Sequence, residues 1–200
     1  MFSGIVKGVT SINSFDFDSI LKLGVCINEV DDCNIGDSIA INGVCLTITS
    51  IDIEQRIVFF DVVTETLNKT NLLSLKNGSQ VNYEKSCKLG DYIGGHQVQG
   101  HVDGVGQISK IERLDGGDII LEIQLSPDLL KFLVAKGYVT IDGMSITIIS
   151  VKENSFTVTL IPHTLESTIS KYYSLNSSVN IEVDPIGKHI HSYMENYNFK

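Results

Sequence analysis

Two stretches of the chain place a small nucleophilic side chain two residues before a threonine, directly after a tight turn. Cys45 and Thr47 follow an Asn-Gly step, and Ser145 and Thr147 follow an Asp-Gly step 100 residues later. Side chains alternate between the two faces of a strand, so each pair lies on one face. Thiol and hydroxyl groups in this arrangement can bind the donor and acceptor edge of a flat heterocycle. The alternative is the ordinary polar outer face of an antiparallel sheet, and the sequence leaves both interpretations open.

Three titratable side chains of the second half have no titratable counterpart in the first half. They are His101, Lys136 and Asp184, and the corresponding residues are isoleucine, glycine and serine. A histidine can transfer protons near neutral pH, which makes His101 a candidate for proton transfer. His96, in the same glycine-rich stretch, is interpreted as a structural histidine that forms hydrogen bonds. Two related sites with different titratable groups can treat two bound molecules differently, one as donor and one as acceptor.

The sequence repeats itself at an interval of about 100 residues. GIVKGV at 4–9 matches GHVDGV at 100–105, and GDSIAINGVCLTITSID at 36–52 matches KGYVTIDGMSITIISVK at 136–152. Two copies at this interval indicate tandem domains, since a solenoid needs at least three shorter units. We expect a boundary near 93–95, with domains at 1–94 and 95–186 and a C-terminal tail at 187–200.

Short strand-like runs at regular spacing predict an all-β fold, with one small antiparallel barrel of six strands in each half. The Asn-Gly and Asp-Gly steps predict type I′ hairpin turns, whose central residues need positive φ. The expected strands lie at 4–12, 22–29, 38–42, 44–52, 57–64 and 80–86, and at 98–111, 118–125, 138–142, 144–152, 155–162 and 178–184.

Few helices are expected. The segment 126–137 predicts a helix with Ser126 as its cap, Pro127 at the first helical position and Gly137 at its end. The segment 161–168 predicts a loop and a helix start, with Thr164 or Ser167 as the cap. The tail from 188 to 200 predicts a short helix that must pack on something, because it has too little apolar surface to fold alone.

The composition excludes several classes of protein. The formal net charge is −9 and no basic stripe with aromatic residues is present, so neither nucleic acid nor an anionic membrane is an expected partner. No apolar run approaches the length of a membrane helix, and the N-terminus does not have the pattern of a signal peptide. The four cysteines lack CxxC spacing, so we expect no metal site; two disulfides are possible, but free thiols in a reducing cytoplasm are preferred.

Seven segments in this order resemble the riboflavin synthase family over nearly the whole chain. They are MFSGIV, NGVCLT, FDVVTETL, GGHQVQGHVDG, IDGMSIT, IPHTLE and VNIEVDP. The resemblance implies two Greek-key barrels that each bind one 6,7-dimethyl-8-ribityllumazine. It also implies transfer of a four-carbon unit between these two molecules, giving riboflavin and 5-amino-6-ribitylaminouracil without cofactor or metal. Family members are homotrimers that trimerise through the C-terminal helix, and lumazine synthase encloses the enzyme in some relatives. Whether it does so here is left open.

The resemblance also implies two sets of binding residues, with each active site lying between the first barrel of one subunit and the second barrel of its neighbour. The set carried over to the first barrel is Gly4, Ile5, Val6, Ser38, Cys45, Leu46, Thr47, Asp61, Val62, Val63, Thr64, Glu65 and Thr66. The set carried over to the second barrel is Gly100, His101, Val102, Lys136, Ser145, Ile146, Thr147, Ile161, Pro162, His163, Thr164, Leu165, Glu166 and Asp184.

Catalysis in this family would require one lumazine to lose a proton from its C7 methyl group and the other to add a nucleophile at C7. His101, with Thr147, is the expected group for proton transfer. Cys45, Ser145 or water is the expected nucleophile, assisted by Asp184, and the sequence does not decide among them. A non-catalytic lumazine- or flavin-binding protein of the antenna type is the alternative. The polar residues kept in both halves favour the enzyme. A flavin-dependent reductase is less favoured because no nicotinamide motif is visible.

Overall fold

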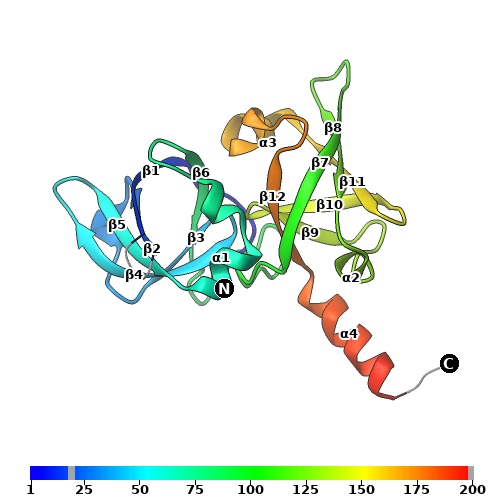
Figure 1. The fold of residues 1–200 in the computed structure, drawn as a ribbon, viewed down its shortest axis with the longest axis horizontal. Coiled ribbons are helices and arrows are strands. Elements are labelled where there is room, and N and C mark those ends of the chain that lie inside the picture. Colours follow the sequence, from blue (N-terminus) through cyan, green and yellow to red (C-terminus); the bar gives the residue numbers. More distant parts are fainter. Residues whose placement is uncertain (18–20, 198–200) are drawn as a thin grey trace.

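Two closed antiparallel β-barrels lie side by side in the computed structural model, which describes residues 1–17 and 21–197 (Figure 1). The strands of the first barrel are β1 (Gly8–Phe17), β2 (Leu21–Cys26), β3 (Ser38–Ile41), β4 (Val44–Asp52), β5 (Ile57–Val62) and β6 (Gln80–Lys85). Those of the second are β7 (Gly104–Arg113), β8 (Ile119–Gln124), β9 (Tyr138–Ile141), β10 (Met144–Val151), β11 (Ser155–Leu160) and β12 (Ser178–Val183).

The two barrels have the same topology. The first closes in the order β1-β2-β5-β4-β3-β6, and the second closes in the equivalent order β7-β8-β11-β10-β9-β12. Strands that are distant along the chain, such as β2 and β5 or β3 and β6, are neighbours, as in a Greek key. The expected all-β fold with two six-stranded barrels and a C-terminal helix is therefore confirmed.

Alternation along each strand separates a buried core from a polar outer face, as predicted. Val44, Leu46 and Ile48 of β4 are buried, whereas Cys45 is half-buried and Thr47 is exposed. The pattern repeats along β10, and each barrel has its own cluster of buried aliphatic and aromatic side chains. The burial of these apolar side chains is the main stabilising contribution to such a fold.

The first strand of each half begins later than predicted. The expected runs start at 4 and 98, but β1 begins at Gly8 and β7 begins at Gly104. Gly4 and Gly100 have φ values of 73° and 77°, which an extended strand does not allow. These glycines redirect the chain, so the residues before β1 and β7 are not part of a barrel wall.

Two tight turns hold the barrels against each other. Asn42 and Asp142 have φ values of 44° and 43° and are followed by glycines with positive φ, as type I′ turns require. The two turns lie back to back, because a Cβ placed on Gly43 would lie 2.7 Å from the backbone nitrogen of Gly143. The buried Asn82 side chain donates to the Asp142 carbonyl oxygen at 2.8 Å, and Asn180 donates to the Asn42 carbonyl oxygen at 2.9 Å. This reciprocal pair gives the barrel interface an approximate twofold symmetry.

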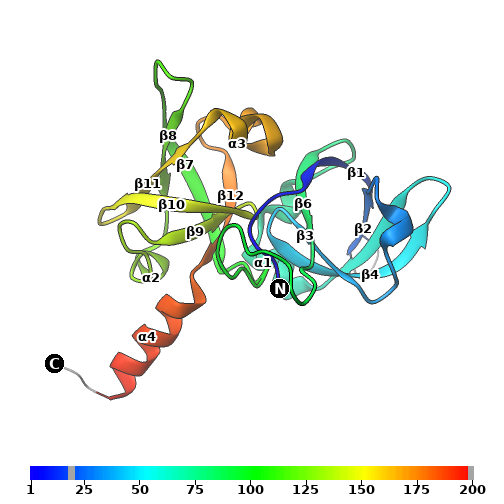
Figure 2. The ribbon, with the colours of Figure 1, turned by 180° about the vertical axis from the view of Figure 1, so that it is seen from behind.

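Seven short helical segments complete the described structure. The α-helices are α1 (Thr64–Lys69), α2 (Pro127–Leu130), α3 (Pro162–Ser167) and α4 (Pro185–Asn196), and the 3-10 helices are η1 (Val30–Asp32), η2 (Asn71–Ser74) and η3 (Ile169–Tyr172). The α4 helix projects away from the second barrel, as the reverse view also shows (Figure 2). No helix of residues 1–17 and 21–197 has the length and apolar character needed to cross a membrane.

The predicted helix boundaries need three corrections. α2 ends at Leu130 and not at Gly137, because the N–H groups of Phe132 and Leu133 bond to carbonyls three residues earlier instead of four. The Ser126 side chain forms no cap hydrogen bond. Thr164 and Ser167 lie inside α3, whose cap position is Ile161. The C-terminal helix begins three residues earlier than expected, because the Asp184 carboxylate accepts from the Ile186 N–H at 2.9 Å. The four cysteines are free thiols, as preferred from the sequence.

Candidate active site

The segments that precede β1 and β7 cross to the opposite barrel. The Ser145 N–H of the second barrel donates to the Gly4 carbonyl at 2.8 Å, and the Cys45 N–H of the first barrel donates to the Gly100 carbonyl at 2.8 Å. Val6 packs against the core of the second barrel, and Val102 packs against the core of the first. The resemblance groups 4–6 with the first barrel and 100–102 with the second, whereas the structure places each segment against the opposite barrel.

Buried carboxylates anchor both crossing segments. Glu84 accepts from the Ser3 N–H at 2.7 Å and the Gly4 N–H at 3.1 Å, and Glu182 accepts from the Gln99 N–H at 2.7 Å and the Gly100 N–H at 2.9 Å. Burial raises the pKa of each carboxyl, and the hydrogen bonds to backbone N–H groups oppose that rise. The sequence analysis missed this pair. The sequence does contain a sign of it, because a glutamate ends both VNYE at 81–84 and the corresponding VNIE at 179–182.

The first half-site is a pocket of about 360 Å³ beside β4 and α1. Six of the predicted binding residues meet there, namely Cys45, Glu65, Thr66, Gly100, His101 and Val102. Val44, Lys69, Thr70 and Asp103 also line it and were not predicted. His101 and Glu65 are exposed at this pocket, while Cys45 is half-buried, so a ligand would have a thiol, an imidazole and the Glu65 carboxylate within reach.

The predicted residues of β3, β4, β5 and the start of α1, apart from Cys45, Glu65 and Thr66, do not line this pocket. Leu46 and Val62 point into the barrel core, so only their backbone atoms can face a ligand. Ser38 pairs with Thr47 in the β3–β4 ladder, and Asp61 is exposed on β5. Val63 and Thr64 are exposed where α1 begins.

The second half-site is centred on Ser145. Its Oγ lies 2.6 Å from Nδ1 of His96, and Nε2 of His96 lies 3.4 Å from the Thr140 Oγ1. The ring of His96 stacks on Tyr138 with centroids 5.1 Å apart and planes 9° apart. Burial lowers the pKa of His96, and the nearby Asp184 carboxylate acts in the opposite direction. His96 was left out of the predicted site, and only its contact with Ser145 places it there.

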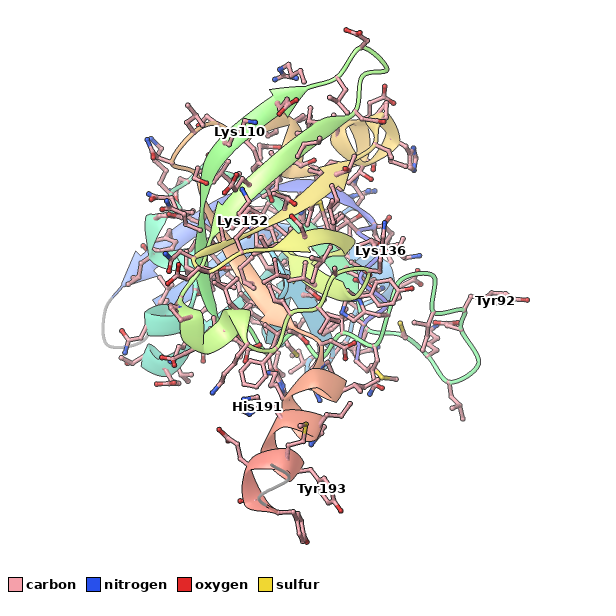
Figure 3. The ribbon with its side chains drawn as sticks, turned by 90° about the vertical axis from the view of Figure 1, so that its right-hand side faces the viewer. Tyr92, Lys110, Lys136, Lys152, His191 and Tyr193 are labelled. Carbon is pink, nitrogen blue, oxygen red and sulfur yellow. The ribbon has the colours of Figure 1, made fainter. Side chains whose placement is uncertain are left out.

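Lys136 has an unusual backbone conformation, whereas Asp184 is half-buried and caps α4 through its bond to the Ile186 N–H. Lys136 has a φ of 68°, a region that favours glycine, and the corresponding residue of the first barrel is Gly36 with a φ of 93°. The Lys136 N–H donates to the Ile148 carbonyl at 2.8 Å, as the Gly36 N–H does to Ile48 at 2.9 Å. The exposed Lys136 side chain is labelled in Figure 3.

The other residues predicted for the second barrel are spread over its outer surface. Thr147 is exposed on β10, and Ile146 is buried with only its backbone available. Ile161, Pro162, His163 and Glu166 are exposed at α3, where Thr164 and Leu165 are half-buried. Among residues 1–17 and 21–197, no hydrogen bond joins His101 or Cys45 to Ser145 or His96. One chain therefore carries two separate half-sites, of which the first contains Cys45 and His101 and the second contains Ser145 and His96.

Comparison with known proteins agrees with this internal duplication. The lumazine binding domain family matches the chain twice, at residues 3–86 and 99–184. Riboflavin synthase of Bacillus amyloliquefaciens is 40% identical over 196 residues, which cover 97% of this chain and 90% of that protein. Riboflavin synthase of Bacillus subtilis strain 168 is 39% identical over 200 residues, which cover 99% of this chain and 92% of that protein.

A solved structure supports the fold. LumP in complex with riboflavin superposes with a TM-score of 0.84, covering 92% of this chain and 100% of that one at 23% identity. The matches over nearly the full length of curated relatives show that this chain belongs to the riboflavin synthase family, whose members contain two lumazine binding domains.

Proposed function

We propose that this chain is a riboflavin synthase that converts two molecules of 6,7-dimethyl-8-ribityllumazine into riboflavin and 5-amino-6-ribitylaminouracil. The observation that carries the proposal is the pair of half-sites, which share one backbone frame and differ in their reactive groups. The first offers Cys45 and His101, and the second offers Ser145 and His96. A dismutation needs two similar sites for two identical molecules, and different chemistry at each site to make one a donor and the other an acceptor.

The proposed reaction begins with a proton transfer and a nucleophilic addition. His101 is exposed at the first half-site and can accept the proton from the C7 methyl group of a lumazine bound there. A nucleophile adds at C7 of the other lumazine, which becomes the electrophile. Holding two rings face to face makes their reaction effectively unimolecular, which can contribute on the order of 7–11 kcal/mol. Lys136, Thr147 and Asp184 are proposed to bind or orient the second lumazine.

We propose that the two half-sites meet between subunits of a homotrimer in the cytoplasm, with no metal and no cofactor. Ile186, Ile190 and Met194 follow one another at intervals of four on α4 and are between 51% and 61% exposed in the single chain. Beside them lies a pocket of about 300 Å³, lined on its other side by Phe132, Val134 and Tyr138. An apolar helix face of this kind is expected to be covered by another subunit. Figure 3 shows the helix extending away from the second barrel.

The proposal is tested by anaerobic incubation of the purified protein with 6,7-dimethyl-8-ribityllumazine alone, followed by absorbance and chromatography. One riboflavin and one 5-amino-6-ribitylaminouracil for every two lumazines consumed, with no added cofactor, is the expected result. Tight binding without riboflavin would instead identify a non-catalytic binder of the LumP kind. The relatives named riboflavin synthase, at 39–40% identity, favour the enzyme over LumP at 23%.

A further inference from the structure

The contacts of His96 form a chain of three polar side chains in the second half-site. A neutral imidazole has one acceptor nitrogen and one N–H, so a ring whose Nδ1 accepts has Nε2 as its donor. With Nδ1 accepting from the Ser145 hydroxyl at 2.6 Å, the Nε2–H donates to the Thr140 Oγ1 at 3.4 Å. Thr140 is buried, and the Tyr138 ring covers one face of the imidazole. The histidine is thus held in one orientation beside a hydroxyl.

This arrangement has no counterpart in the first half-site. Cys45 occupies the position equivalent to Ser145, but among the described residues no hydrogen bond reaches its sulfur. The histidine of the first half-site, His101, is exposed, whereas His96 is 9% exposed.

We propose that His96 is the base that activates Ser145, which makes Ser145 the nucleophile and the second half-site the place where the electrophilic lumazine binds. The inference rests on the proposed function for the identity of that electrophile. In the step, the Ser145 Oγ forms a bond to C7, and an electron pair of the ring double bond at C7 moves into the pyrimidinedione. The hydroxyl proton passes to Nδ1 of His96. It returns to Oγ when the bond between Oγ and C7 later breaks and the serine is restored.

The environment of His96 fits both protonation states that this step requires. Burial lowers the pKa of the imidazole, so its Nδ1 is free to accept a proton before the reaction. The Asp184 carboxylate acts in the opposite direction on the same pKa and stabilises the imidazolium once it forms. Thr140 and Tyr138 keep the ring in place through both states. A nucleophile, its base and a group that orients the base are the three parts of an activated hydroxyl.

A test that does not depend on lumazine uses the S145C variant. The rate of alkylation by iodoacetamide is followed from pH 5 to pH 10 at residue 145, with peptide mass spectrometry separating it from the four native thiols. An imidazole in hydrogen-bond contact favours a thiolate, so the inflection is expected well below the ordinary thiol pKa of about 8.5. When S145C is combined with H96Q, the inflection should return to the ordinary thiol pKa, and alkylation at pH 7 should be at least about tenfold slower. The same inflection with and without His96 would overturn the proposal.

A second readout uses turnover. H96Q is expected to lower kcat strongly in the native background and to have little further effect in S145A, because the two side chains act as one unit. The exposed His189 of α4 provides the matched control, and H189Q should leave the thiol inflection unchanged. Independent losses that multiply in the double variant would contradict the pairing. If no riboflavin is formed but the thiol inflection still depends on His96, the proposed reaction fails while the Ser145–His96 pair stands.

Discussion

Each half-site contains one histidine, and the two differ in exposure and partners. His101 is exposed at a pocket with Cys45, and His96 is buried against Ser145 and Tyr138. A proton acceptor for a substrate methyl group must reach the substrate, which favours the exposed side chain. An activator of a protein hydroxyl must instead contact that hydroxyl, which favours the buried one. The two histidines therefore fit the two halves of the proposed reaction.

If His101 transfers a proton, its substitution should affect turnover much more than lumazine binding. H101Q keeps a polar side chain of similar size at the first half-site, so lumazine affinity should change little. Turnover should fall by about 10²–10⁴-fold, the usual contribution of a general base. Equilibrium titration by fluorescence and steady-state kinetics measure the two quantities separately. Equal losses in affinity and turnover would mean that His101 only binds the substrate.

Spacing in the sequence was enough to select Cys45 and Ser145 as candidates, because both follow a recognisable turn and alternate with buried neighbours. The same reasoning could not identify His96. Its contact with Ser145 joins residues 49 positions apart, and it forms only because the connecting segment folds back onto β10. A lone histidine in a glycine-rich loop has no local pattern that predicts such a partner.

The hairpin turns are the elements that join the half-sites, since each turn lies just before Cys45 or Ser145. G43A combines two costs, a side chain at a φ of 77° and a Cβ 2.7 Å from the Gly143 nitrogen. G78A is the matched control, with a φ of 84° and nothing within 4 Å of the new Cβ. We expect G78A to lose about 1–2 kcal/mol of unfolding free energy and G43A about 1–3 kcal/mol more.

Urea unfolding followed by far-UV circular dichroism measures both free energies. If G43A and G78A lose the same amount, the backbones of the two turns are not in contact in solution. The comparison isolates the contact, because both variants carry the same left-handed strain.

At the level of elements, the strand pattern was predictable and the crossing segments were not. Period-two alternation located all twelve strands to within a few residues, apart from the late starts of β1 and β7. Sequence proximity groups Gly4 and Gly100 each with the adjacent barrel. Their actual positions depend on hydrogen bonds to Ser145 and Cys45 and on the buried Glu84 and Glu182. Such long-range contacts leave no periodic signal.

For the molecule as a whole, one buried acid breaks the symmetry between the barrels. Asp142 accepts from Tyr173 at 2.7 Å, the Asn180 N–H at 2.8 Å and Asn71 at 3.2 Å, whereas its counterpart is the uncharged Asn42. Burial raises its pKa from 3.8 to about 7, against these hydrogen bonds. Asp142 therefore contributes stability that is fully present below its unfolded pKa and is lost as pH rises through about 7.

D142N removes this pH dependence and retains an acceptor for the Asn180 N–H. The stability of D142N relative to the native chain should therefore increase between pH 5 and pH 8. The gain should be at most about 3 kcal/mol, since the native chain loses stability only over the two pH units from 5 to about 7, and one unit is worth about 1.36 kcal/mol. Urea unfolding at both pH values measures it, and D16N at an exposed acid should show no such change. A constant difference between D142N and the native chain would contradict the raised pKa.

The exposed face of α4 predicts how the assembly responds to charge. I190E introduces a carboxylate at a side chain that is 56% exposed in one chain, so the fold of a single chain should be unaffected. If that face is covered by other subunits, the buried charge should dissociate the trimer. Light scattering after size exclusion measures the mass. I53E, at an isoleucine that is 63% exposed on the first barrel, is the control that should keep the native mass.

In the proposed homotrimer, one active site combines the first half-site of one chain with the second half-site of another. Mixing H101Q with S145A tests this arrangement, because each variant damages a different half-site. After subunit exchange, confirmed by native mass spectrometry, about a quarter of the junctions in a random cyclic trimer combine two intact halves. Riboflavin formation should then rise well above that of either parent, toward about a quarter of the native rate. Exchanged trimers that are no more active than the parents would contradict the claim and place both half-sites of each active site in the same chain.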